Sequence, residues 1–395
     1  MKFGLLWHSF SSGNLGVGAL SISNMLLIDA AAREKGIVPE FLIIGSTGQC
    51  DYPPDPARFK YEFIEFNEKT LLKHPHKLLQ AVRSCDAIFD IGEGDSFSDI
   101  YGSKRLIKLL VSKGMALAGN IPLVLSPQTI GPFKSNWGTR AAAWAMHRST
   151  KVFARDHQSF AVLRDLEIDH RDEVIDVAFA LPFSRHSEVR SPDQVAIGLS
   201  VSALLHHGGY EGNANQFGLK VNYEKLTAQL IDALLERGHE VHLVPHVIPL
   251  GFPEEDDYAL AERLRDKYPT VKLAPRFHGP IEAKSYIAAL DFFVGARMHA
   301  TIGAFSAGVP VVPLAYSRKF SGLYESLDYG HVVDLRTEST ESALEMVLAK
   351  LDNRDRLRNE VAASQDIIRR KLAAYSRALE ELMSKLVPGH LAYQG

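Results

Sequence analysis

The stretch from Asp291 to Phe320, DFFVGARMHATIGAFSAGVPVVPLAYSRKF, decides the fold. Residues 290–294 and 309–314 are short apolar runs of the kind that form buried strands. Residues 300–307 between them have helical spacing, and Gly308 supplies the C-terminal stop of that helix. A strand, a helix and a second strand in this order predict a parallel βαβ unit of an open α/β sheet.

Cationic side chains follow both predicted strands. Arg297 and His299 come directly after the first strand, and Tyr316, Arg318 and Lys319 come after the second. The carboxyl ends of adjacent parallel strands meet at one edge of a sheet, where open α/β folds bind ligands. We therefore predict a phosphate or carboxylate site, helped by the backbone N–H groups of the helix that begins there. The alternative is that Arg297 pairs with an ordinary carboxylate and His299 is a hydrogen-bonded core residue.

Length and composition are typical of a soluble enzyme with two domains. The chain has 395 residues, of which 46% are hydrophobic and 23% charged, and chains of this length usually form more than one core. The net charge is −3. It provides no basic field for nucleic acid, so we expect no nucleic-acid partner.

The two cysteines, Cys50 and Cys85, cannot build a disulfide framework or a cysteine-based zinc site, which fits a reducing compartment. Residues 1–10 have the features of neither a signal peptide nor a membrane anchor, and no other apolar run reaches spanning length. We expect a cytoplasmic protein. Peripheral membrane contact and homo-oligomer formation stay open at this stage.

Two series of predicted strands and helices meet at residues 182–194, a polar segment with charges of both signs and two prolines. We predict an α/β protein of two doubly wound, Rossmann-like domains that face each other across a cleft. The first domain covers residues 1–185 and the second covers residues 195–365. Residues 366–395 are expected to form a helix long enough to pack back across the first domain.

Two loops early in the chain carry candidate binding residues. Asn14 lies in a Gly-rich loop between a predicted strand at 2–8 and a helix from about residue 19. Glu93 and Asp95 follow another predicted strand. An acidic pair at this position would repel a phosphate, so we expect contacts with sugar hydroxyls and no metal site.

Three further strand ends carry polar candidates. Gln128 lies in the rigid loop Pro127–Pro132, and Arg155 follows a short strand without a local capping role to explain it. His246 stands at the end of a predicted strand and is a second candidate for proton transfer. The acids at 254–257 begin a helix, where the helix dipole and solvation explain them.

Several motifs resemble the polysaccharide pyruvyl transferase family, over about residues 10–325. The most specific is G-A-R-M-H-A-T-I-x-A followed by G-V-P-V-V-x-L-x-Y-x-x-K, at residues 295–319. The other motifs are P-Q-T-I-G-P at 127–132, R-D-x-x-S at 155–159 and G-N-L-G at 13–16. The chain departs from the family pattern at Val17, where the family has Asp.

The resemblance implies a transferase with a GT-B-like architecture that acts in polysaccharide or exopolysaccharide biosynthesis. Phosphoenolpyruvate is the implied donor substrate, and no separate cofactor is implied. A pyruvyl group would move to the hydroxyls of a sugar or a lipid-linked glycan. The first domain would hold this acceptor, and the second would hold phosphoenolpyruvate.

Such a reaction forms a ketal and releases phosphate. It needs a general acid near C3 of the enol, a base for the hydroxyls, and cations on the two anionic groups. The resemblance assigns the acid to His299, and the base candidates are His246 and Asp95. The expected anion clamps are Arg155, Arg297 and Lys319.

Two other functions are compatible with the sequence. One is a nucleotide-sugar-dependent GT-B glycosyltransferase, in which Arg297 and Lys319 would hold a diphosphate. The other is a non-catalytic sugar-binding protein. This alternative stays open because the chain departs from the family pattern at Val17 and Glu93. The loop around Gln128 and the Arg-x-His element favour the pyruvyl transferase.

Overall fold

The computed structural model describes residues 1–45, 51–92, 96–100, 102–185, 191, 193–209, 215–249 and 253–387. The chain forms two compact units. The first comprises Met1–Ser11, Leu20–Val177 and Arg369–Gly395, and the second comprises Ser12–Ala19 and Ala178–Ile368. Cys50, Glu93 and Asp95 lie outside the described residues.

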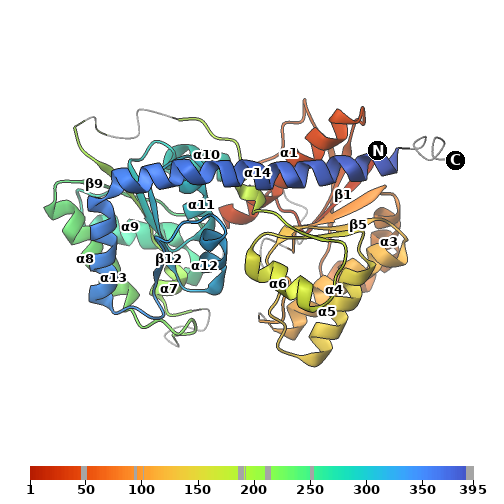
Figure 1. Ribbon diagram of the computed structural model, residues 1–395, viewed down its shortest axis with the longest axis horizontal. Coiled ribbons are helices and arrows are strands. Elements are labelled where there is room, and N and C mark those ends of the chain that lie inside the picture. The colour runs from red at the N-terminus through yellow and green to blue at the C-terminus, as the bar shows by residue number, and fades with distance from the viewer. Residues whose placement is uncertain are drawn as a thin grey trace. The chain divides into compact units, whose positions relative to one another are not determined.

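The first unit contains a seven-stranded sheet, in the order β3-β2-β1-β4-β5-β6-β7, and all its strand pairs are parallel (Figure 1). The strands are β1 (Lys2–Leu6), β2 (Glu40–Gly45), β3 (Lys60–Glu65), β4 (Ala87–Asp90), β5 (Leu123–Gln128), β6 (Lys151–Ala154) and β7 (Arg171–Glu173). The helices are α1 (Leu15–Glu34), α2 (Glu68–Lys73), α3 (Pro75–Arg83), α4 (Ser103–Ala118), α5 (Asn136–Arg148) and α6 (His157–Asp165). The chain passes into the second unit within the 3₁₀ helix η2 (Val177–Ala180). The strand order reverses between β1 and β4, as in a doubly wound sheet.

The second unit contains a six-stranded parallel sheet in the order β10-β9-β8-β11-β12-β13. Its strands are β8 (Ala196–Ser200), β9 (Glu240–Leu243), β10 (Lys272–Leu273), β11 (Phe292–Gly295), β12 (Val311–Ala315) and β13 (Val333–Asp334). Its helices are α7 (Ala203–His206), α8 (Tyr223–Glu236), η4 (Pro253–Glu255), α9 (Asp257–Lys267), α10 (Pro280–Ile287), α11 (Met298–Ser306), α12 (Arg318–Glu325), α13 (Thr340–Asp352) and α14 (Arg354–Leu386). Helices α8 and α13 pack side by side on this sheet (Figure 1).

The predicted βαβ unit is confirmed as β11, α11 and β12. Both strands are buried along their whole length, because helices cover both faces of a parallel sheet. The strands begin two residues later than predicted, at Phe292 and Val311, and α11 begins earlier, at Met298. Gly308 ends the helix as predicted: its φ is +79°, and its N–H donates to the Phe305 carbonyl at 3.1 Å.

Helix α1 begins four residues earlier than predicted. The side chain of Asn14 accepts the Gly16 N–H at 3.1 Å, and its carbonyl accepts the Val17 N–H at 3.0 Å. Gly16 and Gly18 of the Gly-rich stretch therefore lie in the first turn of a helix, whereas Gly13 and Asn14 precede it as predicted. Helix α1 is also long and apolar enough to span a membrane, with a mean hydropathy of 1.6, a run that our sequence analysis did not recognise. In the fold, 72% of that segment is buried, as in a core helix.

The division of the chain differs from the predicted domain boundaries. The residues Ser12–Ala19, expected in the first domain, belong to the second unit, and the chain next enters that unit at Ala178. Contacts within the second unit explain the earlier crossing. The ring of Phe179 lies 6.2 Å from the ring of Phe305, and the Leu181 carbonyl accepts a hydrogen bond from Lys284 at 2.7 Å.

Helix α14 contributes its last turns to the first unit, through Tyr375. The Tyr375 hydroxyl is buried, donates to Asn24 Oδ1 at 2.8 Å and lies 3.2 Å from Ser126 Oγ. Asn24 Nδ2 lies 3.0 Å from Ser126 Oγ and 3.0 Å from His8 Nε2. Burial lowers the pKa of His8 to about 3, so the neutral ring accepts from Asn24 and donates from Nδ1 to the Leu6 carbonyl.

We expect Tyr375→Phe to lower the free energy of unfolding by about 1–3 kcal/mol, because the polar groups of Asn24 and Ser126 stay buried without their partner. Urea denaturation of both proteins measures the change. Tyr258→Phe is the matched control, since the Tyr258 hydroxyl has no hydrogen bond within the described part of the chain. Equal losses in the two variants would contradict a specific role for the Tyr375 network.

Candidate functional site

The segment Ser12–Ala19 docks on the residues that follow β9. The Leu15 N–H donates to the His246 carbonyl at 3.1 Å, and the Gly13 carbonyl accepts the Ile248 N–H at 2.7 Å. Between these bonds, Asn14 forms an antiparallel bridge with Val247. The start of α1 is thereby fixed beside His246, and this placement explains why the helix begins at Leu15.

Gly16 allows α1 to approach His299 closely. A Cβ atom at Gly16 would lie 2.3 Å from His299 Nδ1, and a Cβ atom at Gly13 would lie 2.5 Å from the Ile248 carbonyl oxygen. Neither position has room for a side chain. Of the two glycines of the G-N-L-G motif, Gly16 is therefore needed for packing against His299 and Gly13 for packing against the backbone of Ile248.

His246 is a buried, neutral base. Its side chain is 5% exposed, and neither ring nitrogen has a hydrogen-bond partner among the described residues. Burial, together with smaller effects of the nearby His299 and Arg297, lowers its pKa to about 3. The His246 ring is therefore uncharged at neutral pH, and one of its two ring nitrogens has a lone pair that can accept a proton.

His246 and His299 line the same small cavity. It measures about 10 Å³, and Lys284 of α10 also borders it. The strand ends thus bring together two of the predicted catalytic residues, as expected from the parallel topology. Lys284 was missed by the sequence analysis, because a lysine in the middle of a short helix resembles an ordinary surface residue.

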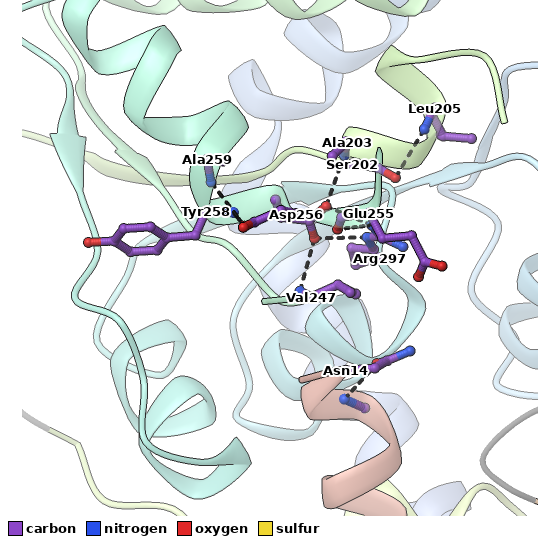
Figure 2. Close-up of polar contacts among 12 residues, drawn as sticks. Asn14, Ser202, Ala203, Leu205, Val247, Glu255, Asp256, Tyr258, Ala259 and Arg297 are labelled. Atoms are coloured by element: carbon purple, nitrogen blue, oxygen red, sulfur yellow. Dashed lines mark hydrogen bonds and ion pairs between the residues drawn. The ribbon is translucent and has the colours of Figure 1, made fainter. Parts of the chain in front are cut away.

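Arg297 is held by a buried carboxylate. Its Nε donates to Asp257 Oδ2 at 2.9 Å and its Nη2 to Asp257 Oδ1 at 2.6 Å, a two-point ion pair (Figure 2). The pair is almost fully buried, with Arg297 8% and Asp257 0% exposed. Burial acts to lower the pKa of Arg297, but the Asp257 carboxylate outweighs this effect and raises it. Arg297 is thus permanently charged.

Asp257 connects the ends of several elements. Besides Arg297, it accepts the N–H groups of Ala203 at 2.9 Å and Val247 at 3.0 Å. The expectation that the acids at 254–257 are solvated is wrong for Asp257, although Asp256 does cap α9, accepting two backbone N–H groups. Pairing of Arg297 with a carboxylate was the alternative to the predicted anion clamp. The ion pair occupies two of the guanidinium donors.

Tyr316, Arg318 and Lys319 follow β12, the neighbour of β11. All three side chains are partly exposed, and the ring of Tyr316 packs 5.0 Å from that of Phe217. Arg318 is the first residue of α12. Helices α11 and α12 therefore begin at adjacent strand ends, and neither N-cap residue caps its helix with its own side chain.

Gln128 and Arg155 lie in the first unit, at the ends of β5 and β6. The side-chain amide of Gln128 bonds to nearby backbone: its Nε2 donates to the carbonyls of Asp90 at 3.0 Å and Ser126 at 3.1 Å. Arg155 is 2% exposed, and it donates to Asp176 and to Thr129 Oγ1, both at 2.8 Å. Both side chains therefore have structural partners.

The described residues hold no group of three or more His, Cys, Asp or Glu side chains placed to bind a metal ion. A larger hollow of about 240 Å³ lies beside Phe217 and Tyr223 in the second unit. Its described lining contains Glu224 and His206 but neither Lys nor Arg. This hollow does not have the charge that an anionic ligand requires.

A family model for polysaccharide pyruvyl transferases matches residues 25–318. The chain belongs to the polysaccharide pyruvyl transferase family. It is similar to the amylovoran biosynthesis protein AmsJ of Erwinia amylovora, with 22% identity over 315 residues that cover 75% of this chain and 73% of AmsJ. The match supports a transferase of polysaccharide biosynthesis.

Solved structures show the fold of this family member. A sucrose-phosphate synthase from Thermosynechococcus elongatus has a TM-score of 0.60 at 11% identity, covering 98% of this chain and 99% of that chain. A UDP-GlcNAc 2-epimerase from Methanocaldococcus jannaschii has a TM-score of 0.56 at 12% identity, covering 88% and 92%. These likenesses confirm the predicted pair of Rossmann-like, GT-B-like domains.

We expect Asp257→Asn to lower the free energy of unfolding by about 3–5 kcal/mol, because it leaves the Arg297 charge buried without a counter-charge. Chemical denaturation measures the change. Asp266→Asn serves as the control, since Asp266 pairs with Arg265 at the surface, where the side chains are 71% and 44% exposed. An Asp257→Asn protein as stable as Asp266→Asn would contradict the structural role of the buried ion pair.

Gly16→Ala should destabilise the protein by about 1–3 kcal/mol, because the added methyl group displaces the His299 ring. Gly114→Ala is the matched control in another helix, α4. A Cβ atom there meets nothing within 4 Å, so this change should stabilise the protein by up to about 1 kcal/mol. Thermal unfolding compares the two, and a Gly16→Ala protein as stable as Gly114→Ala would contradict the close packing.

Proposed function

We propose that this family member transfers a pyruvyl group from phosphoenolpyruvate to hydroxyls of a sugar or glycan, forming a ketal and releasing phosphate. The observation that carries the proposal is the shared cavity of His246 and His299 beside the cationic ends of β11 and β12. Membership of the polysaccharide pyruvyl transferase family supports the same class of reaction. No metal or cofactor is part of the proposal.

The anionic donor fits the amino ends of α11 and α12. Both helices direct backbone N–H groups and the positive end of their dipoles toward the edge of the sheet. Arg318 and Lys319 add charge in the first turn of α12. Arg297 contributes by holding the start of α11 in place through its ion pair with Asp257.

Proton transfer falls to the two histidines. His299 gives a proton to C3 of the enol, which makes C2 electrophilic for attack by a sugar hydroxyl. His246 is neutral because it is buried, so it accepts the hydroxyl proton as that bond forms. The second hydroxyl then attacks C2 as the C2–O bond to phosphate breaks, the leaving phosphate takes up the proton of that hydroxyl, and the ketal closes.

Phosphate release from phosphoenolpyruvate, measured with a panel of sugar and lipid-linked acceptors, tests the proposal. We expect release only when an acceptor is present, with an acceptor product that gains one pyruvyl ketal by mass spectrometry. Melting temperature with phosphoenolpyruvate or nucleotide sugars separates the other functions. Stabilisation by a nucleotide sugar alone would favour a glycosyltransferase, and sugar binding without turnover would favour a non-catalytic protein.

His299→Gln should retain binding of phosphoenolpyruvate and lose turnover by ~10²- to 10⁴-fold, because glutamine donates a hydrogen bond but transfers no proton. Incorporation of solvent deuterium into the product methyl group should be lost in parallel. His278→Gln, at an exposed position of the same unit, is the control and should behave as wild type. Normal turnover of His299→Gln would place the acid elsewhere.

A further inference from the structure

Lys284 is a buried lysine without a carboxylate partner. Its side chain is 3% exposed, and Nζ donates to the carbonyls of Leu181 at 2.7 Å and Phe179 at 3.4 Å. The ring of Phe183 lies 5.0 Å from Nζ, and no ion pair involves Lys284 within the described residues. Burial lowers its pKa to about 7, so the charged and neutral forms coexist near neutral pH.

The position of Lys284 connects it to both histidines. Lys284, His246 and His299 line one cavity of about 10 Å³, which is close to the room that one water molecule needs. The stem of Lys284 crosses Gly303, with Cγ 3.7 Å from the place of a Cβ atom there. Gly303 lies four residues after His299 in α11 and therefore on the same face of that helix.

A water molecule in this cavity would have three nitrogen-bearing side chains around it. Buried waters typically make about three hydrogen bonds. His246 supplies ring nitrogens that no described residue satisfies, and Lys284 has an N–H beyond the two that it gives to backbone carbonyls. The cavity is therefore close to the size of one bound water, and His246, Lys284 and His299 are the polar side chains in its otherwise apolar lining.

We propose that Lys284 is the proton store of this site, a positioning residue that passes a proton to His299 through one water molecule in the shared cavity. The inference rests on the proposed function, because it concerns how the acid of that reaction is loaded. Phosphoenolpyruvate brings a carboxylate and a phosphate, and their negative charge stabilises an imidazolium nearby. The incoming substrate thus draws the proton from Lys284 toward His299.

The transfer conserves charge and atoms. An N–H bond of the Lys284 ammonium breaks as an O–H bond of the water forms, and another O–H bond of that water breaks as an N–H bond forms on His299. Lys284 becomes a neutral amine, and His299 becomes an imidazolium that protonates C3. The proton that His246 takes from the sugar hydroxyl returns to Lys284, so the protein ends the cycle unchanged.

Other ionisable groups do not compete for this proton. The described residues of η2 and of the first turn of α1 contribute none. Arg297, which reaches His246 electrostatically, is neutralised by Asp257. The ionisable side chains of α10 itself are engaged elsewhere: Glu282 accepts the His278 N–H at 2.7 Å, and Tyr286 bonds His242 at 2.7 Å.

Lys284→Arg separates proton storage from a structural role. Arginine keeps the positive charge and the donors for the carbonyls of Leu181 and Phe179, but it releases no proton in this pH range. Lys284→Met removes both the charge and the donors. Lys267→Arg, at an exposed position of α9, is the control.

The measurement is the pH profile of kcat and of KM for phosphoenolpyruvate. Because the charged lysine is the donor form, the wild-type rate should fall as the pH rises through about 7. Both Lys284 variants should lose about tenfold or more in kcat with KM changed little, and the fall near pH 7 should disappear. A Lys284→Arg protein with the wild-type rate and profile would overturn the inference and leave Lys284 as a structural residue.

A second measurement needs neither substrate nor turnover. Nitrogen-15 NMR of labelled histidine follows the titration of His299 in the wild type and in Lys284→Arg. We expect the midpoint to differ by at least about half a pH unit, because groups that share a proton titrate together. An identical midpoint would overturn the inference even if the wild type consumes phosphoenolpyruvate. Failure of the proposed function would appear differently, as a wild type that releases no phosphate.

Discussion

The buried ion pair of Arg297 and Asp257 is the interaction on which the site depends. Asp257 also binds the N–H groups of Ala203 and Val247, so one carboxylate joins the start of α9 to the segments that follow β8, β9 and β11. A buried pair gives little net stability over an apolar pair of the same size, but losing one partner is costly. Its contribution here is geometric, because it fixes the loop from which His246 projects and the turn that starts α11.

Burial sets the chemistry of the residues around the cavity more than charge does. His246 is kept neutral and Lys284 is brought near neutrality mainly by desolvation. Desolvation acts without a fixed negative partner, so the site keeps its positive potential for an anionic substrate. A carboxylate beside these groups would have held their protons more firmly and weakened that potential.

The sequence predicted the fold well because local patterns carry the information. Apolar runs of strand length between helical segments are sufficient to predict parallel sheets, and Gly308 marks a helix end by its own conformational freedom. The start of α1 could not be predicted in this way. Gly13, Asn14 and Gly16 are typical of a loop, but bonds from Gly13, Asn14 and Leu15 to residues 246–248, more than two hundred positions away, fix the start of the helix at Leu15.

The same limit applies to the candidate site. His246 and His299 were found because both stand at strand ends, a position that sequence spacing reveals. The partner of Arg297 was not found, because Asp257 belongs to a run of acids that looks solvated and nothing local distinguishes it from its neighbours. Lys284 was not predicted as a site residue, because its burial results from tertiary packing and has no local signal in the sequence.

The interleaving of the two units sets an order on biosynthesis. The first unit needs Tyr375 to bond Asn24 and Ser126, so it stays incomplete until α14 has been synthesised. Residues 12–19 emerge from the ribosome early but find their partners only after residues 246–248 and His299 have followed. Neither unit is one continuous segment of the chain, and the histidine site needs residues 12–19 together with residues 246–303. The site can therefore assemble only after α11 has been synthesised.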